Sequence, residues 1–216
     1  MTEDDQIRAE QTRAAWARIE LWLKQHAPRN YAALPPPCTE EQVRAHEQRL
    51  DAALPADVRA LYLMRNGTGS EDEFDKTPTS LGPLRSEEDR KEWEQWDPLA
   101  PCCYPLPDGL GIYPLETRDF IDHTYIGLEE DPKYLPLLSA GDVGVSGQFI
   151  DMTSDSDTYG QLGHYFLLGA LPEPGGPTLA AYLTTVADAF EAGQGRPGFD
   201  GFGPPPVVNG RLDWDS

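Results

Sequence analysis

Residues 39–69 constrain the fold most, because they encode two short helices separated by an obligatory break. Thr39 is a favourable N-cap, and Gln42 three residues later completes a capping box at the start of the first helix. Pro55 cannot continue that helix, but it suits the first turn of a second one. An Asn-Gly pair at 66–67 tolerates the left-handed conformation that ends a helix. The stretch therefore predicts a helix, a sharp turn and a second helix.

Two further helices are predicted, one on each side of this pair. Within residues 7–26, Trp16 and Leu23 share one face, so this helix is expected to dock on the core rather than present an aromatic ridge to a partner. Three consecutive prolines within 29–37 predict an extended arm that ties this helix to the core. Apolar residues within 179–190 recur with the i, i+3, i+4, i+7 spacing of a helix that packs on a sheet.

Short apolar runs between turn residues predict an antiparallel sheet of about five or six strands. The runs flank a Pro-Asp-Gly turn at 107–109 and continue at 120–126, 134–138, 148–152 and 163–168. Together with the helices they predict an α+β fold, in which N-terminal helices and one C-terminal helix pack on the sheet.

Composition divides the chain into three segments. Residues 1–37 are expected to form an N-terminal helix with a Pro-rich arm, and residues 38–195 an α+β domain with an acidic insertion at 70–97. Residues 196–216 contain four Pro and four Gly in 21 residues, so they predict a tail without a core of its own, pinned by Phe199, Phe202 or Trp214.

The order of these motifs resembles the SUKH superfamily, which includes the SMI/KNR cell-wall-assembly regulators of fungi and bacterial immunity proteins. The opening residues that carry the resemblance are Leu54, Pro55, Asp57, Arg59, Leu61, Asn66 and Gly67. The later motifs follow in the family's order, so that the resemblance covers about 39–193, at residues 134–138, 140–147, 149–151, 163–168 and 179–190. The resemblance implies a SUKH-like fold and a non-enzymatic protein-binding function, either toxin neutralisation or regulatory scaffolding.

Motifs for catalysis or cofactor binding are absent from the sequence. It has no G-x-S-x-G serine turn, phosphate-binding loop or G-x-G-x-x-G fingerprint, and its four histidines are too scattered for a zinc site. Asp155 and Asp157 match the first positions of a calcium loop, but Tyr159 and Phe166 stand where oxygen ligands are needed. A turn between strands is the preferred interpretation. We therefore expect no enzymatic activity, cofactor or metal, with a small enzyme built on an unrecognised acid pair as the open alternative.

The charge balance constrains the partner. The chain has 17 basic and 37 acidic residues, a formal net charge of -20, which disfavours nucleic acid and anionic membranes and favours a basic protein. Fifteen of these 20 net charges fall in residues 70–97, 116–131 and 142–157, whereas charge that serves solubility alone need not cluster in this way. The predicted partner-binding residues are Asp119, Asp122, Asp151, Asp155, Asp157, Glu71, Asp72 and Glu73.

The leading hypothesis from the sequence is an immunity protein that binds and neutralises a cognate toxin domain, with a basic, nuclease-type domain as the candidate. The alternative is a regulatory or scaffold protein without a toxin partner. The polar, acidic start and the lack of an apolar run of membrane-spanning length predict a soluble, cytoplasmic protein. The sequence leaves the oligomeric state open.

Overall fold

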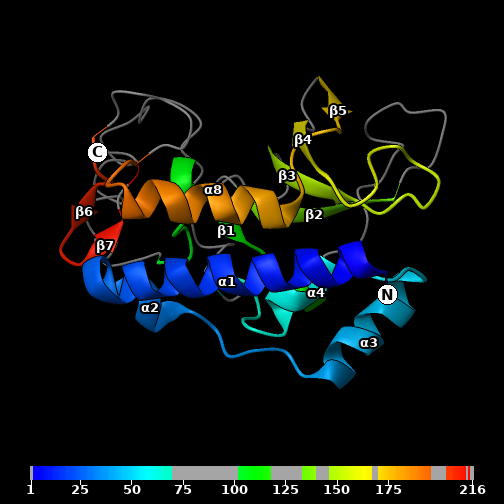
Figure 1. Cartoon of the computed structure of the whole chain (residues 1–216), viewed down its shortest axis with the longest axis horizontal. Helices are drawn as coiled ribbons and strands as arrows, with labels where there is room; N and C mark the ends of the chain where they lie inside the picture. The colour runs from blue at the N-terminus through cyan, green and yellow to red at the C-terminus, as the bar shows by residue number, and fades with distance from the viewer. Residues whose placement is uncertain are drawn as a thin grey trace, which may run out of the picture.

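The computed structural model describes residues 2–69, 102–117, 133–139, 146–166, 170–195, 203–212 and 214. The predicted strand at 120–126 and the predicted acidic insertion at 70–97 lie outside these residues. Within the described part of the chain, helices pack on an antiparallel sheet (Figure 1). This arrangement confirms the predicted α+β fold.

The described helices are α1 (Glu3–His26), α2 (Pro28–Ala33), α3 (Glu40–Leu50), α4 (Ala56–Tyr62) and α8 (Leu179–Glu191). At the start of α3, Gln42 N–H donates to the Thr39 hydroxyl at 3.2 Å, and Thr39 N–H donates to the Gln42 side chain at 2.9 Å. These two bonds confirm the predicted capping box. The first helix begins four residues earlier than predicted, because Thr2 and Asp5 form a second capping box.

The predicted extended arm is wrong for residues 29–33, which belong to α2. Pro28 occupies the first position of this helix, where its fixed φ angle favours helical backbone. The side-chain amide of Asn30 then holds the helix in place through two hydrogen bonds. Its Nδ2–H donates to Cys102 O at 3.0 Å, and its Oδ1 accepts from Leu212 N–H at 2.8 Å. Long-range contacts therefore decide the conformation of this segment.

The main sheet contains β1 (Gly111–Ile112), β2 (Tyr134–Ser139), β3 (Ser146–Asp151), β4 (Leu162–Phe166) and β5 (Ala170–Glu173), paired antiparallel in chain order. The strands predicted at 134–138, 148–152 and 163–168 are confirmed, and so is the turn at 107–109, which is bridged by Leu106 and Leu110. The sequence did not predict β5, an edge strand whose proline disguises the strand pattern.

The C-terminal segment forms a small hairpin that docks beside α2. Its strands are β6 (Val207–Val208) and β7 (Arg211–Leu212). Arg29 N–H donates to Gly210 O at 3.0 Å, and the Trp214 indole N–H donates to Tyr104 O at 3.2 Å. Trp214 therefore pins the tail as predicted, although the hairpin itself was not predicted.

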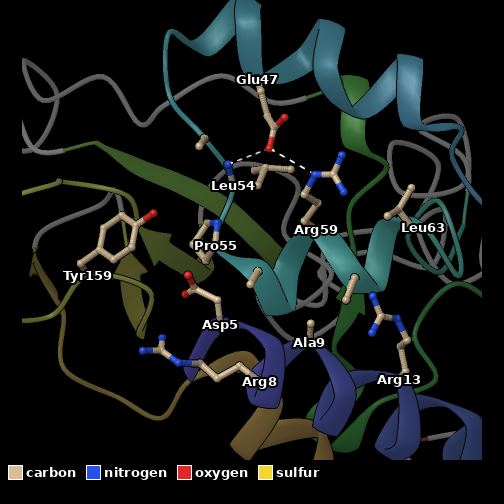
Figure 2. A pocket seen from close by; sticks show the side chains of 13 residues that line it. Asp5, Arg8, Ala9, Arg13, Glu47, Leu54, Pro55, Arg59, Leu63 and Tyr159 are labelled. Atoms are coloured by element: carbon tan, nitrogen blue, oxygen red, sulfur yellow. Dashed lines mark hydrogen bonds and ion pairs between the residues drawn. The ribbon is translucent and has the colours of Figure 1, made fainter. Parts of the chain in front are cut away.

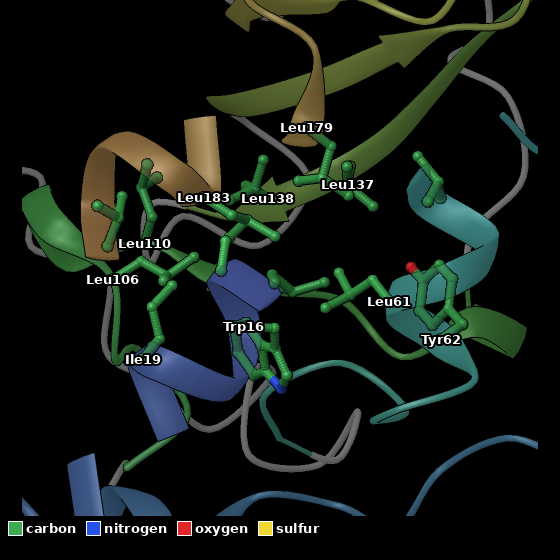
Figure 3. Packing of buried hydrophobic residues seen from close by; sticks show 14 of the residues in the cluster. Trp16, Ile19, Leu61, Tyr62, Leu106, Leu110, Leu137, Leu138, Leu179 and Leu183 are labelled. Atoms are coloured by element: carbon green, nitrogen blue, oxygen red, sulfur yellow. The ribbon is translucent and has the colours of Figure 1, made fainter. Parts of the chain in front are cut away.

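The core forms where α1 meets α4, α8 and the sheet. Helix α1 lies alongside α8 and packs on α4 as well (Figure 1). Trp16 and Ile19 of α1 are fully buried in one cluster with Leu61 of α4, Leu183 of α8 and Leu137 of β2 (Figure 3). Docking of the N-terminal helix is thus confirmed.

The Asn-Gly pair after α4 connects the helices to the sheet. The Asn66 side chain accepts a hydrogen bond from Leu115 N–H at 2.8 Å, and Gly67 has a φ of 75°. Immediately after it, Thr68 N–H donates to Ile112 O at 2.9 Å, and Ile112 N–H donates to the Thr68 hydroxyl at 2.8 Å. The prediction that this pair ends the helix is wrong, because α4 ends at Tyr62 with Leu63 as its C-cap; the pair instead brings the segment after the helix against β1.

Replacing Gly67 is expected to destabilise the protein strongly. In Gly67→Ala, the new Cβ would lie 2.5 Å from Ile112 O at a φ of +75°, so steric overlap adds to backbone strain and the loss should be about 3 kcal/mol or more. Gly193→Ala is the matched control, because its φ is +71° but nothing lies within 4 Å of the Cβ position. Urea unfolding should give a loss of about 1–2 kcal/mol for the control. Equal losses would contradict a role for close backbone approach.

Candidate functional site

A cleft of about 560 Å³ opens between the N-terminal half of α1 and the α3–α4 pair (Figure 2). This volume falls in the range of about 300–1,000 Å³ that is typical of ligand sites. Small and apolar residues line part of it, namely Ala9, Ala53, Leu54, Pro55, Ala56 and Ala60. The charged and aromatic residues of the lining are Asp5, Arg8, Arg13, Glu47, Arg59 and Tyr159.

Glu47 and Arg59 form one wall of the cleft and neutralise each other. Glu47 Oε1 accepts a hydrogen bond from Leu54 N–H at 3.1 Å and lies 3.7 Å from Arg59 Nε (Figure 2). Arg59 also forms an ion pair with Glu40, and hydrogen bonding to Glu40 raises the pKa of the guanidinium. The same interaction lowers the pKa of Glu40. Two carboxylates thus share one guanidinium, so this group of three side chains carries one net negative charge.

The opposite wall comes from α1 and carries one acid, Asp5, and two arginines, Arg8 and Arg13. Asp5 accepts a hydrogen bond from Thr2 N–H at 2.7 Å, and this bond is the main reason that the pKa of its carboxyl is lowered. Arg8 and Arg13, by contrast, form no hydrogen bond or ion pair with any residue that the structure describes. Arg8 lies beside Gly160, where an added Cβ would come within 3.2 Å of its Nη1 atom.

Asp57 is buried next to the cleft and joins the starts of two helices. Its Oδ1 accepts a hydrogen bond from Val58 N–H at 3.0 Å in α4, and its Oδ2 accepts one from Ala180 N–H at 3.4 Å in α8. Burial raises the pKa of its carboxyl, while these two bonds and the charge of Arg8 act against that rise. The sequence placed an acid in the first turn of α4, but only the structure reveals its contact with α8.

The turn between β3 and β4, residues 152–160, is built around Asp151. This buried carboxylate accepts hydrogen bonds from Thr153 N–H at 2.8 Å, the Ser156 hydroxyl at 2.7 Å and the Thr158 hydroxyl at 2.6 Å. Gly160 N–H closes the turn by donating to Asp151 O at 2.8 Å. These side-chain and backbone hydrogen bonds are those of a closed turn, and among the described residues no three metal-ligating side chains come together.

The structure separates the predicted partner-binding acids into two kinds. Asp155 and Asp157 are exposed on the turn, where Tyr159 is also 38% exposed at the edge of the cleft. Asp151 is fully buried and holds the turn together, so it is removed from the predicted partner-contacting residues. The remaining predicted residues, Asp119, Asp122, Glu71, Asp72 and Glu73, lie outside the described part of the chain.

Sequence reasoning missed the cleft itself. Arg8, Arg13 and Glu47 are ordinary helix-surface residues in the sequence, and only the packing of α1 against the helical pair brings them together. Arg8, Arg13 and Arg59 all line this cleft, but they are three of many basic residues in the sequence, and no motif links them there.

The described part of the chain is an antiparallel sheet covered by helices, with a cleft that contains charges of both signs and a turn that exposes two acids. Surfaces of this kind are suited to contacts with other macromolecules. The family model of the SMI1 / KNR4 family (SUKH-1) matches residues 37–192, so the chain belongs to this family and the resemblance is confirmed. Membership supports a protein-binding or immunity-type module in a family that is generally non-enzymatic. No curated protein matches the chain. None of the helices in the described ranges is long and apolar enough to cross a bilayer.

Truncation of two aspartates a few residues apart should change the stability of the protein by different amounts. Asp151→Ala leaves one backbone N–H and two hydroxyls without their buried acceptor, so we expect a loss of about 2–4 kcal/mol in the free energy of unfolding. Asp155→Ala removes an exposed carboxylate, so its unfolding midpoint in urea should match that of the parent protein. A mild effect of Asp151→Ala would contradict its role as the centre of the turn.

Proposed function

We propose that the protein is an immunity protein, which neutralises a cognate toxin domain by covering a basic functional surface of that domain. The observation that carries the proposal is the turn at 152–160, which presents Asp155, Asp157 and Tyr159 on a hydrogen-bonded frame. Membership of the SMI1 / KNR4 family supports protein binding as the activity of such a surface.

The chemistry of the turn fits this role. Acidic side chains accelerate association with a basic surface by electrostatic steering and suppress binding to acidic proteins. An exposed tyrosine supplies apolar contact area and a hydrogen-bonding hydroxyl, which is why tyrosine is frequent among the residues that dominate binding energy. A nuclease-type toxin has a basic cleft that binds phosphates, and carboxylates placed there compete with the nucleic acid for the same cations.

The full acidic surface extends beyond the turn in this proposal. On the basis of their charge and clustering in the sequence, we include Asp119, Asp122, Glu71, Asp72 and Glu73 with Asp155 and Asp157. We also propose that the encounter takes place in the cytoplasm, a reducing compartment in which the three free cysteines stay as thiols.

Affinity capture from the native cell lysate tests the proposal, with the protein as bait and washes at low and high salt. Mass spectrometry is expected to identify one dominant basic partner that is released by salt and whose toxic activity is inhibited by the protein. Recovery of several housekeeping proteins without salt sensitivity would contradict neutralisation and favour the regulatory scaffold of the same family.

Charge reversal on the turn should slow association with the captured partner. Asp155→Lys with Asp157→Lys is expected to lower the association rate constant about tenfold or more at low ionic strength, with a smaller effect at high salt. The matched control is Glu10→Lys with Glu41→Lys, which changes net charge equally at two exposed acids on helices. Stopped-flow kinetics measure both. Equal slowing in the two variants would assign the effect to net charge and exclude the turn as a contact.

A further inference from the structure

We propose that the outer face of α1 pairs with the same face of a second copy of the chain, as an antiparallel helix pair with two-fold symmetry. Three features of α1 carry the inference. They are an exposed stripe with the spacing of a helix-pairing seam, small residues in the middle of that stripe, and charges that complement each other only when the two copies run in opposite directions.

The outer face of α1 carries one continuous stripe of exposed residues. Its members recur at alternating spacings of four and three residues, which is the a/d spacing of helices that pair side by side. At 3.6 residues per turn they fall within a sector of about 100° around the helix. The core residues Trp16 and Ile19 lie on the opposite side of α1, so the stripe takes no part in the core. The stripe consists of Glu3, Ile7, Glu10, Ala14, Ala17, Leu21 and Lys24.

Two large apolar side chains of the stripe are exposed to water. Ile7 is 48% and Leu21 is 56% exposed, and they are two of the five large hydrophobic residues that are exposed among those the structure describes. Helix α1 lies between α8 and α4, and no described helix or strand passes in front of it (Figure 1). Single exposed apolar residues are ordinary. Two on one stripe, with alanines between them, form a surface that a second helix can cover.

Ala14 and Ala17 occupy the middle of the stripe. Because their side chains are single methyl groups, two helices can approach closely there and gain dispersion contacts along their length. In an antiparallel pair centred between these two residues, Ala14 of one copy faces Ala17 of the other. Ile7 and Leu21 then lie on either side of the centre, so that the large side chains flank the close contact rather than obstruct it.

The charges of the stripe favour a second copy in the antiparallel orientation. Glu3 and Glu10 lie in the N-terminal half of α1, whereas Lys24 lies in the last turn. In a parallel pair each charge would face its like. In the antiparallel pair, Lys24 lies opposite Ile7 of the other copy, about one turn from both of its acids. Two-fold symmetry forms this group of charges twice.

These charges are available for a second copy. Glu3 and Glu10 form no hydrogen bond or ion pair with any residue that the structure describes. The ammonium of Lys24 lies 5.7 Å from the centre of the Tyr31 ring, an exposed cation–π contact that is weak. Pairing therefore breaks no strong interaction within the chain.

The net charge of the chain limits the strength of the pair. Each copy carries a formal charge of -20, so two copies repel each other at long range. At physiological ionic strength, exposed charges separated by more than about 8 Å are largely screened. A single pair of helices also gives an interface at the small end of the range for specific complexes. The expected product is a transient dimer in equilibrium with the monomer.

Sedimentation equilibrium of the full chain tests the proposal at physiological ionic strength, over protein concentrations from micromolar to nearly millimolar. A reversible monomer–dimer equilibrium is expected. A monomer at every concentration would overturn the inference.

Ala14→Glu should disrupt the dimer, because it places two carboxylates beside the centre of the pair. The dissociation constant should rise about tenfold or more. The matched control is Ala45→Glu at an exposed alanine of α3, which changes the net charge equally and should stay within about twofold of the parent. Glutamate is a good helix former, and circular dichroism checks that both variants remain folded. Equal weakening by the two variants would overturn the inference.

Lys24→Glu tests the orientation. In the antiparallel pair this change replaces attraction by repulsion at two symmetric places, so the dissociation constant should rise roughly threefold to tenfold. Arg44→Glu on α3 is the control, since it changes the net charge equally at an exposed residue outside the stripe. A parallel pair would already place like charges together at this position. Equal effects of the two variants would therefore overturn the antiparallel arrangement.

Pairing through α1 and neutralisation of a toxin are tested separately. Sedimentation requires no toxin, and failure to capture a basic partner leaves the dimer unaffected. The kinetics of Asp155 and Asp157 variants use dilute protein, at which a transient dimer is dissociated. The pairing also depends on α1 alone, which precedes the family match at residues 37–192.

Discussion

The burial of Trp16 is the contact on which the rest of the structure depends. Its indole lies fully inside the core, and the indole N–H donates to Glu20 at 2.6 Å, so the ring is buried without an unsatisfied donor. Glu20 in turn accepts two hydrogen bonds from Arg65, at 2.8 and 3.0 Å, just after α4. One side chain thus fixes α1 against α4 by packing and, through Glu20, by charge. Full burial of a large apolar side chain contributes about 1.5–3 kcal/mol.

Helix α1 is also held to α8, which places it at the centre of the molecule. Arg18 forms ion pairs with Asp188 at 2.6 Å and with Glu191 at 2.5 Å. These pairs are partly exposed and contribute little alone, so the apolar face beneath them provides most of the stability. They fix the rotation of α1 about its axis, and that rotation determines that Arg8 and Arg13 face the cleft. The lining of the cleft therefore follows from the way the core packs.

Local signals predicted the elements of this fold better than their contacts. The capping residues of α3, the break at Pro55 and the stripe of α8 act within a few neighbouring residues, so the sequence alone contains them. The helical conformation of α2 could not be predicted in the same way, because Asn30 is held by residues 72 and 182 positions away. Non-local contacts of this kind leave no periodic trace in the sequence.

The candidate site illustrates the same limit at the level of single residues. Asp151, Asp155 and Asp157 are equivalent acids in the sequence, yet the first is buried with three donors and the other two are exposed. Asp151 ends β3, and its side chain is buried. An aspartate in a turn can accept hydrogen bonds from nearby hydroxyls and N–H groups, so the buried carboxylate keeps its hydrogen-bond partners. The number of charges in the sequence locates the acidic segment. Only the burial seen in the structure distinguishes the structural Asp151 from the exposed Asp155 and Asp157.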